Sequence, residues 1–209
     1  MKNTVKLCVV SILFIFLFTS ISPASTDFSQ IDTDDIRLAA TQQLATWLDK
    51  IPSGQEQHFG FADRDEFSTA TIGTPIHTFY FADELEAPAK ELLVPSYEWR
   101  VPVLVNNEYR ALLTVAPVEG VLNIVDLGAA RLARELGTQT NHKNVLLRSF
   151  KAKCDFLVAD HTGKGIMLMP LQSARRNLSQ LDHASKDVFT IDEIRGMILF
   201  PENKPGVAR

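Results

Sequence analysis

The sequence predicts an α+β protein in which an antiparallel sheet of about five to six strands, a meander plus a hairpin, packs against three to four helices. The chain has 209 residues, of which 45% are hydrophobic, and this is ample for one domain with its own core. Apolar residues recur at helical spacing in four segments. Between residues 74 and 170 they also alternate with polar residues, which is typical of half-buried strands.

The first 24 residues, MKNTVKLCVVSILFIFLFTSISPA, predict a secretory signal peptide. Lys2 and Lys6 flank the start of an apolar run over residues 7–18, and Ser22 and Ala24 are the small residues before a cut after Ala24. The run is shorter than the roughly 20 apolar residues of a membrane span. An uncleaved anchor is the alternative. We therefore expect a secreted or periplasmic protein, and the sequence leaves open which of the two.

Removal of residues 1–24 leaves residues 25–209, which we expect to form a single α+β domain with flexible ends at residues 25–33 and 201–209. Two lysines leave with the signal, so the remaining 19 basic and 25 acidic residues give a net charge of −6. Cys154 is then the only cysteine, and no internal disulfide is predicted.

The four predicted helices follow from apolar stripes. Residues 34–51 form the first, with acidic residues in its first turn and Pro52 after its end. Residues 129–136 form the second, with Gly137 expected in the left-handed cap position. The third follows Pro170 and carries a stripe of Leu171, Ala174, Leu178 and Leu181. The last spans residues 191–198, where Thr190 and Glu193 form a capping box.

The strands of the meander are predicted at residues 99–105, 109–115 and 121–127, after a further strand at residues 74–82. Asn106 and Asn107 join the first two as a tight hairpin, because Asn tolerates the positive φ angles of such turns. Pro102 lacks an N–H, so its strand is expected at an edge or a bulge of the sheet.

The stretch FKAKCDFLVADHTGKG, residues 150–165, gathers reactive side chains but predicts a strand and a turn. Its apolar residues alternate from Phe150 to Val158, which places Cys154 in the core and Lys151 and Lys153 on the opposite face. Residues 160–163 are expected to turn the chain, and residues 164–170 to return as the second strand of a hairpin. A core cysteine is favoured over a catalytic one, since apolar surroundings raise a thiol pKa.

Charge is distributed unevenly along the chain. Residues 25–98 carry 4 basic and 14 acidic side chains, whereas residues 99–176 carry 11 basic and 6 acidic ones. A binding surface is predicted from the basic part, consisting of Lys151, Lys153, Arg175 and Arg176. The alternative is that the acidic N-terminal part folds against this surface and neutralises it.

Catalytic and metal-binding motifs are absent from the sequence. The histidines are scattered, no HExxH, paired-cysteine, EF-hand or GxSxG pattern occurs, and no catalytic residue, metal or cofactor is predicted. An enzyme therefore has no support from motifs. A hydrolase whose site is assembled only in the tertiary structure, with a histidine about 3 Å from Cys154 or a serine, is the alternative.

Several strings resemble a group of uncharacterised exported bacterial proteins. They are IGTPIHTFYF, VPSYEWRVPVLVNNEYRALLTV, LGAARLAREL, CDFLV and MPLQSAR, within residues 70–180. In that group a GTP strand, a tryptophan before PV, a VNGE-type hairpin and a PL.SAR helix recur in this order. The resemblance implies export and a single α+β domain, and it transfers no site or activity. Asn107 departs from the pattern, since the group has glycine there.

The sequence as a whole favours a non-enzymatic binding or protein-interaction domain, with the hydrolase as the alternative. The predicted partner is an anionic component of the cell envelope or another protein. Nucleic acid is not expected for an exported protein of net charge −6, and a membrane would be contacted only through an uncleaved signal.

Overall fold

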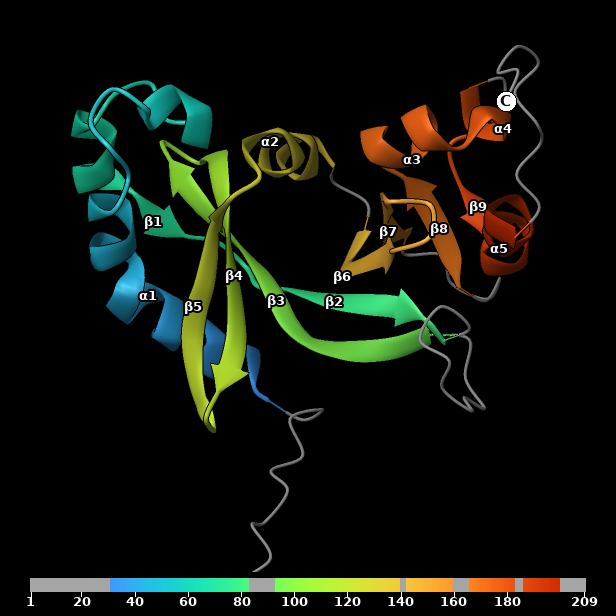
Figure 1. Ribbon diagram of the computed structural model, residues 1–209, viewed down its shortest axis with the longest axis horizontal. Coiled ribbons are helices and arrows are strands. Elements are labelled where there is room, and N and C mark those ends of the chain that lie inside the picture. Colours follow the sequence, from blue (N-terminus) through green and yellow to red (C-terminus); the bar gives the residue numbers. More distant parts are fainter. Residues whose placement is uncertain (1–30, 83–92, 140–141, 160–165, 183–185, 200–209) are drawn as a thin grey trace, which may run out of the picture.

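The computed structural model describes residues 31–82, 93–139, 142–159, 166–182 and 186–199. Within them nine strands form one sheet, mostly antiparallel, and five α-helices pack on it (Figure 1). The α+β class is confirmed, but the expected numbers of strands and helices were too low. The predicted signal, the turn at residues 160–163 and the tail from residue 201 lie outside the described residues.

The strands run across the sheet in the order β5-β4-β3-β2-β6-β7-β8-β9, and β1 pairs with β3 beside β2. Their bounds are β1 Thr71–Ile72, β2 Ile76–Phe81, β3 Leu93–Val105, β4 Glu108–Val118, β5 Val121–Gly128, β6 His142–Ser149, β7 Cys154–Ala159, β8 Met167–Pro170 and β9 Phe189–Thr190. Strands β3, β4 and β5 are the predicted meander. Asn106 and Asn107 have φ angles of 51° and 65° in the predicted hairpin.

Pro102 lies in a central strand and not at an edge, but the other predicted possibility, a bulge, is close to it, since the β3–β4 register shifts between Val103 and Leu104. Its carbonyl accepts a hydrogen bond of 2.8 Å from the N–H of Gly73, so its nitrogen also points to that side of β3. There the chain passes between the end of β1 and the start of β2. The missing N–H therefore removes no ladder bond, and the strand tolerates proline in the middle of the sheet.

Strand β6 was not predicted, and it gives the sheet its parallel pair. Thr78 of β2 lies opposite Leu146 of β6 in parallel register, while β6 pairs antiparallel with β7. Only residues 145–147 of β6 are apolar, so its sequence lacks a long alternating pattern. The short strands β1 and β9 account for the rest of the undercount.

The predicted strand from Phe150 is wrong in its first half. Residues 150–153 form a turn, Phe150 is 52% exposed, and Lys153 has a φ of 52°. Strand β7 begins only at Cys154. From there the predicted alternation holds, because Cys154, Phe156 and Val158 are buried in one cluster.

The five helices are α1 Thr33–Asp49, α2 Ala130–Thr138, α3 Gln172–Asn177, α4 Ser179–Asp182 and α5 Ile191–Leu199. The predicted third helix is divided at Leu178, whose φ and ψ of −111° and 101° are not helical. Gly137 is not a left-handed cap, since α2 continues to Thr138; a Cβ there would lie 3.1 Å from the ring of Tyr109. The α5 capping box is confirmed, with the Thr190 N–H donating to Glu193 Oε2 over 2.8 Å.

The helices cover both faces of the sheet. On β4, Leu113 packs with α1, and the next residue towards the N-terminus, Leu112, packs with α2, so these two helices lie on opposite faces. Helices α3, α4 and α5 pack against β7 and β8 at the other end (Figure 1). Helices α2 and α3 lie beside each other, although the 33 residues from 139 to 171 separate them in the chain.

Candidate functional site

Helix α2 presents a polar stripe away from the sheet. Ala133 and Leu136 are buried against β4. The polar stripe of α2 consists of Arg131, Arg134, Glu135 and Thr138. Their spacing of three and four residues places them on one face of the helix. Burial of the apolar stripe therefore fixes the direction in which these polar groups point.

Helix α3 forms the facing wall, and its first turn is anchored from two sides. Glu135 Oε1 of α2 accepts a hydrogen bond of 2.5 Å from the backbone N–H of Gln172. The hydroxyl of Ser173 accepts one of 2.9 Å from the N–H of Asp155 in β7. Ala174 is buried, which directs Gln172 and Arg175 towards α2. The distance between the two helices is thus set by specific hydrogen bonds.

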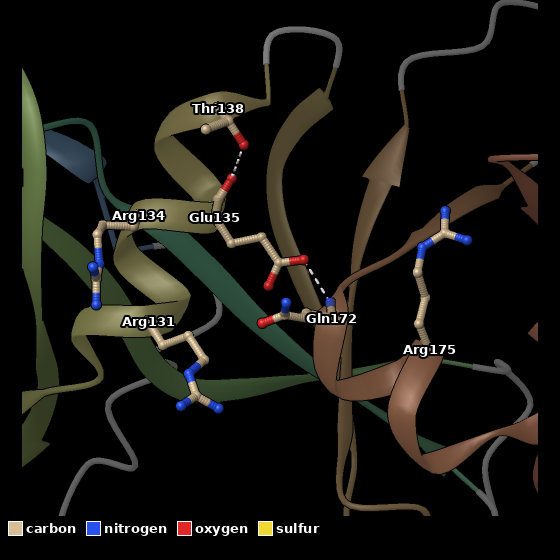
Figure 2. A pocket seen from close by; sticks show the side chains of 6 residues that line it. All are labelled: Arg131, Arg134, Glu135, Thr138, Gln172 and Arg175. Carbon is tan, nitrogen blue, oxygen red and sulfur yellow. Dashed lines mark hydrogen bonds between the residues drawn. The ribbon is translucent and has the colours of Figure 1, made fainter. Parts of the chain in front are cut away.

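Between the helices lies a cleft of about 530 Å³, which we call the α2–α3 cleft. It is lined by Arg131, Arg134, Glu135, Thr138, Gln172 and Arg175. Figure 2 shows the two α2 arginines on one wall, Arg175 on the other, and the Glu135 side chain reaching across to Gln172. Three arginines and one glutamate give the lining a net charge of +2 (3 − 1).

The three arginines of the α2–α3 cleft are weakly neutralised. Among the described residues Arg131 and Arg134 form no ion pair; the Nε of Arg134 donates to the carbonyl of Ala130 over 3.3 Å. Arg175 pairs with Asp187 over 3.2 Å, but the Asp187 side chain is 89% exposed. An ion pair with so exposed a partner contributes little. Guanidinium groups are therefore available on both walls for an anion.

Glu135 is the one acid that lines the cleft, and its surroundings favour the protonated form of its carboxyl group. Burial raises the pKa of its carboxyl, and the charge of Asp155 raises it further. The hydrogen bond from Gln172 and the charges of Arg175 and Arg176 act in the opposite direction, but the net pKa is above the ordinary value of 4.5. Protonation of Glu135 would make the lining still more positive.

A second, smaller hollow lies at the turn between β6 and β7, and we call it the β6–β7 hollow. Its volume is about 300 Å³, and it is lined by Arg148, Ser149, Phe150, Lys153, Cys154 and Asp155. The Nε of Arg148 donates to Asp155 over 2.7 Å. The ring of Phe150 stacks on that of Tyr80 with 4.5 Å between centroids. The hollow thus combines two cations, one carboxylate and an exposed aromatic face.

The residues of the sequence-predicted basic surface are divided between these two places. Arg175 lines the α2–α3 cleft and Lys153 lines the β6–β7 hollow. Lys151 and Lys153 stand in a turn and not on one strand face, which corrects the predicted arrangement. Arg176 is exposed on α3. The side-chain amide of Asn177 donates to the carbonyl of Lys153 over 2.7 Å, so the turn adjoins the end of α3.

Among the residues that the structure describes, the acidic N-terminal part forms no ion pair with the cleft arginines. Its ion pairs join Glu56 to Arg64, at 3.1 Å, Glu66 to Arg110, at 2.8 Å, and Glu98 to Arg100, at 3.8 Å. Helix α1 packs on the sheet face opposite α2. The apolar stripe of α2 predicted the helix but gave no indication that its arginines line a site. The polar spacing of Arg131, Arg134 and Glu135 was the available signal.

A buried arginine on the α2 face of the sheet forms a separate network. Arg100 of β3 is 9% exposed, and its Nη1 donates to the hydroxyl of Thr114. Burial lowers its pKa, as does the nearby charge of Arg148, while Glu98, 3.8 Å from its Nη2, acts against this. Thr114 lies on the adjacent strand β4, Glu98 on β3 itself and Arg148 on β6, beyond β2, so these groups link several strands of the sheet.

The described residues give the hydrolase alternative no triad. His77 Nε2 lies 2.8 Å from the carbonyl oxygen of Ser96, and its ring stacks on Trp99. His58 lies edge-on to Phe59. The side chains of His142, His161 and His183 lie outside the described part. Within that part, no group of three or more His, Cys, Asp or Glu residues is placed to hold a metal.

Cys154 is 1% exposed and belongs to the core cluster beneath α3, α4 and α5, as its position in the strand pattern predicted. None of the helices in the described ranges has both the length and the hydropathy of a membrane span. No protein-family model matches the chain, and comparison with curated proteins and with solved structures gave no significant match. The resemblance to exported bacterial proteins stays a prediction.

Proposed function

We propose that this protein is a non-enzymatic binding domain that takes up an anionic ligand in the α2–α3 cleft. The observation that carries the proposal is that arginines from both helices, Arg131 and Arg134 of α2 and Arg175 of α3, line one cleft of about 530 Å³. Guanidinium groups bind carboxylate, sulfate and phosphate oxygens through paired N–H donors. Pockets of 300–1,000 Å³ are of the size that small ligands fill.

The cleft favours binding over catalysis because its groups are suited to holding charge. Arg131, Arg134 and Arg175 stay protonated at physiological pH, so they supply neither a base nor a nucleophile. The carboxylate of Glu135 already accepts a hydrogen bond from Gln172, and in this position it spaces the two helices. Thr138 and the Gln172 side chain add neutral hydrogen-bonding groups at the rim.

We further propose that the protein acts outside the cytoplasm, as the composition of residues 1–24 suggests. An anionic component of the cell envelope would then be the natural source of the ligand. This part of the proposal rests on the sequence alone, and the cleft chemistry is independent of it.

The test is calorimetric titration of the purified protein with sodium sulfate and with pyrophosphate at neutral pH. Arg131→Gln and Arg175→Gln, on opposite walls, are each expected to weaken binding about fivefold or more, since each removes a charge-assisted hydrogen bond. Arg37→Gln is the matched control, because Arg37 is exposed on α1, which packs on the other face of the sheet. Equal effects of all three substitutions, or no saturable binding, would refute the proposal.

A further inference from the structure

The α2–α3 cleft and the β6–β7 hollow lie on either side of the start of α3. Glu135, from the α2–α3 cleft, holds the first residue of α3 through the Gln172 N–H. Asp155, from the β6–β7 hollow, holds the second residue, Ser173. The charge of Asp155 also raises the pKa of Glu135, so the two carboxyl groups are near each other. A ligand that crosses the short helix α3 would thus meet both hollows.

Cationic groups lie along the surface that leads from the α2–α3 cleft over α3 to the β6–β7 hollow. Arg131, Arg134 and Arg175 line the α2–α3 cleft, Arg176 is exposed on α3, and Lys153 lines the β6–β7 hollow. Asn177, at the end of α3, fixes the turn that carries Lys153 through hydrogen bonds of 3.0 Å and 2.7 Å to the carbonyls of Ala152 and Lys153. The basic groups are therefore attached to one rigid surface.

The same path also carries groups that suit hydroxyl-bearing ligands. Glu135 and Asp155 are acids at the boundary between the hollows, and although Glu135 accepts a hydrogen bond from Gln172 and Asp155 pairs with Arg148, each carboxylate keeps lone pairs that can accept hydrogen bonds from hydroxyl groups. Thr138 and Gln172 add neutral polar groups in the cleft. Phe150 is 52% exposed beside Lys153 and is supported from behind by Tyr80. An exposed ring of this kind offers a stacking face to a sugar.

We propose that the ligand of this surface is an acidic polysaccharide that occupies the α2–α3 cleft and the β6–β7 hollow together. Its carboxylate groups pair with the arginines of the cleft and with Lys153, its hydroxyl groups donate to Glu135 and Asp155, and one sugar ring lies on Phe150. This inference rests on the proposed function of the cleft and adds to it the class of the ligand and a second subsite.

Other polyanions fit these features less well. Single-stranded nucleic acid is bound through several aromatic stacking platforms together with a basic groove, whereas the cleft lining contains no aromatic side chain. Polyphosphate has no hydroxyl groups along its chain that could donate hydrogen bonds to Glu135 and Asp155. A polymer that alternates acidic groups with hydroxyl groups matches the alternation of arginines and carboxylates on the surface.

The experiment measures binding of defined galacturonate oligomers to the purified protein by isothermal titration calorimetry. A digalacturonate is chosen to probe the α2–α3 cleft alone, and an octagalacturonate to probe both subsites together. Lys153→Asn removes one of the two cations of the β6–β7 hollow and leaves Arg148, which is paired with Asp155; asparagine tolerates the positive φ of this position. Arg131→Gln removes a cation of the cleft, and Arg37→Gln on α1 is the control. The melting temperature of each variant verifies that it is folded.

We expect the octamer to bind more tightly than the dimer. Lys153→Asn is expected to weaken octamer binding roughly threefold to fivefold, the effect of one exposed ion pair, and to leave dimer binding unchanged. Arg131→Gln should weaken both oligomers, and Arg37→Gln neither. Maltooctaose, which is uncharged, should not bind.

Three outcomes would overturn the inference. Equal affinity for dimer and octamer, or an octamer insensitive to Lys153→Asn, would remove the second subsite. Polyphosphate or single-stranded DNA binding as tightly as the octamer would show that the ligand class is wrong. Failure of both galacturonates with retained, Arg131-dependent sulfate binding would also refute the polysaccharide while leaving the proposed anion-binding cleft intact. Loss of sulfate binding as well would refute the proposed function itself.

Discussion

Replacement of Gln43 by alanine is expected to loosen the edge of the sheet at β5. The Gln43 side chain projects from α1 and completes the hydrogen bonding of this outermost strand. Its Nε2 donates to the carbonyl of Leu122 over 3.2 Å, and its Oε1 accepts from the N–H of Ile124 over 3.1 Å. The amide thus pairs with β5 as another strand would, and it occupies backbone groups that an open edge exposes.

The magnitude follows from these two partly buried hydrogen bonds. Each contributes about 0.5–1.5 kcal/mol to the free energy of unfolding, and water can replace some of that at an edge strand. Alanine regains a few tenths of a kcal/mol through its higher helix propensity. The net loss for Gln43→Ala is therefore about 1–2 kcal/mol, which lowers the melting temperature of a domain of this size by roughly 2–8 °C.

The assay is urea unfolding followed by circular dichroism, together with amide hydrogen exchange at Ile124. Gln42→Ala is the matched control, since Gln42 is exposed on the same helix and its replacement carries the same change in propensity. Gln43→Glu retains an acceptor for the Ile124 N–H but loses the donor to Leu122, so its stability should fall between those of the wild type and Gln43→Ala. The reasoning is refuted if Gln43→Ala is as stable as Gln42→Ala and the Ile124 amide remains protected.

Further predictions concern the cleft, the core, a tight turn and maturation. Because burial raises the pKa of Glu135 above 4.5, this carboxyl should take up a proton as the pH falls, and its protonation should both strengthen sulfate binding and increase the stability of the folded protein. Glu135→Gln should flatten the pH profiles of sulfate affinity and of stability. Profiles that the substitution leaves unchanged would contradict this prediction. Cys154→Ala should cost about 1 kcal/mol, and rapid thiol labelling of the folded wild type would argue against a core position. Gly60→Ala should destabilise the protein by about 3 kcal/mol or more, because Gly60 has a φ of 100° and an added Cβ would lie 2.1 Å from the Arg110 carbonyl oxygen. Gly54→Ala should cost only about 1–2 kcal/mol, because Gly54 has a φ of 84° but no atom within 4 Å of an added Cβ. Equal losses of stability would mean that the backbone φ alone, and not the steric clash, determines the cost. Mass spectrometry of the exported protein should give an N-terminus at Ser25, and an intact Met1 in the membrane fraction would indicate an anchor.

Features encoded within one element were readable from the sequence. The stripe of α1 predicted the burial of Ile36, Ala40, Leu44 and Leu48. The Asn106–Asn107 turn and the α5 capping box were predicted from residue types that favour one local backbone geometry. These predictions succeed because the period of a helix or a strand and the preferences of turn residues depend on neighbours a few positions away.

The candidate site was readable only in part. Arg175 was predicted to be basic and on the surface, but nothing local indicates that Arg131 and Arg134 share a cleft with it. Their meeting requires α2 to pack on β4 and α3 to follow β8, and it depends on the hydrogen bond between Glu135 and Gln172, 37 residues apart. The lysine pair at 151 and 153 was misplaced because an alternating pattern in four residues cannot distinguish the end of a strand from a tight turn.

The sequence by itself determined the α+β class, the meander, the position of Cys154 in the core and the uneven distribution of charge. Only the tertiary structure decided that β6 pairs in parallel with β2, that Pro102 fits inside a central strand, and that the arginines of α2 and α3 share a cleft. The physical reason is that local preferences act through a few neighbouring residues, whereas strand order and helix contacts depend on burying apolar faces that lie far apart in the chain. The cleft is a product of those distant contacts, so the binding function that we propose for it depends on the packing of α2 and α3 rather than on a motif.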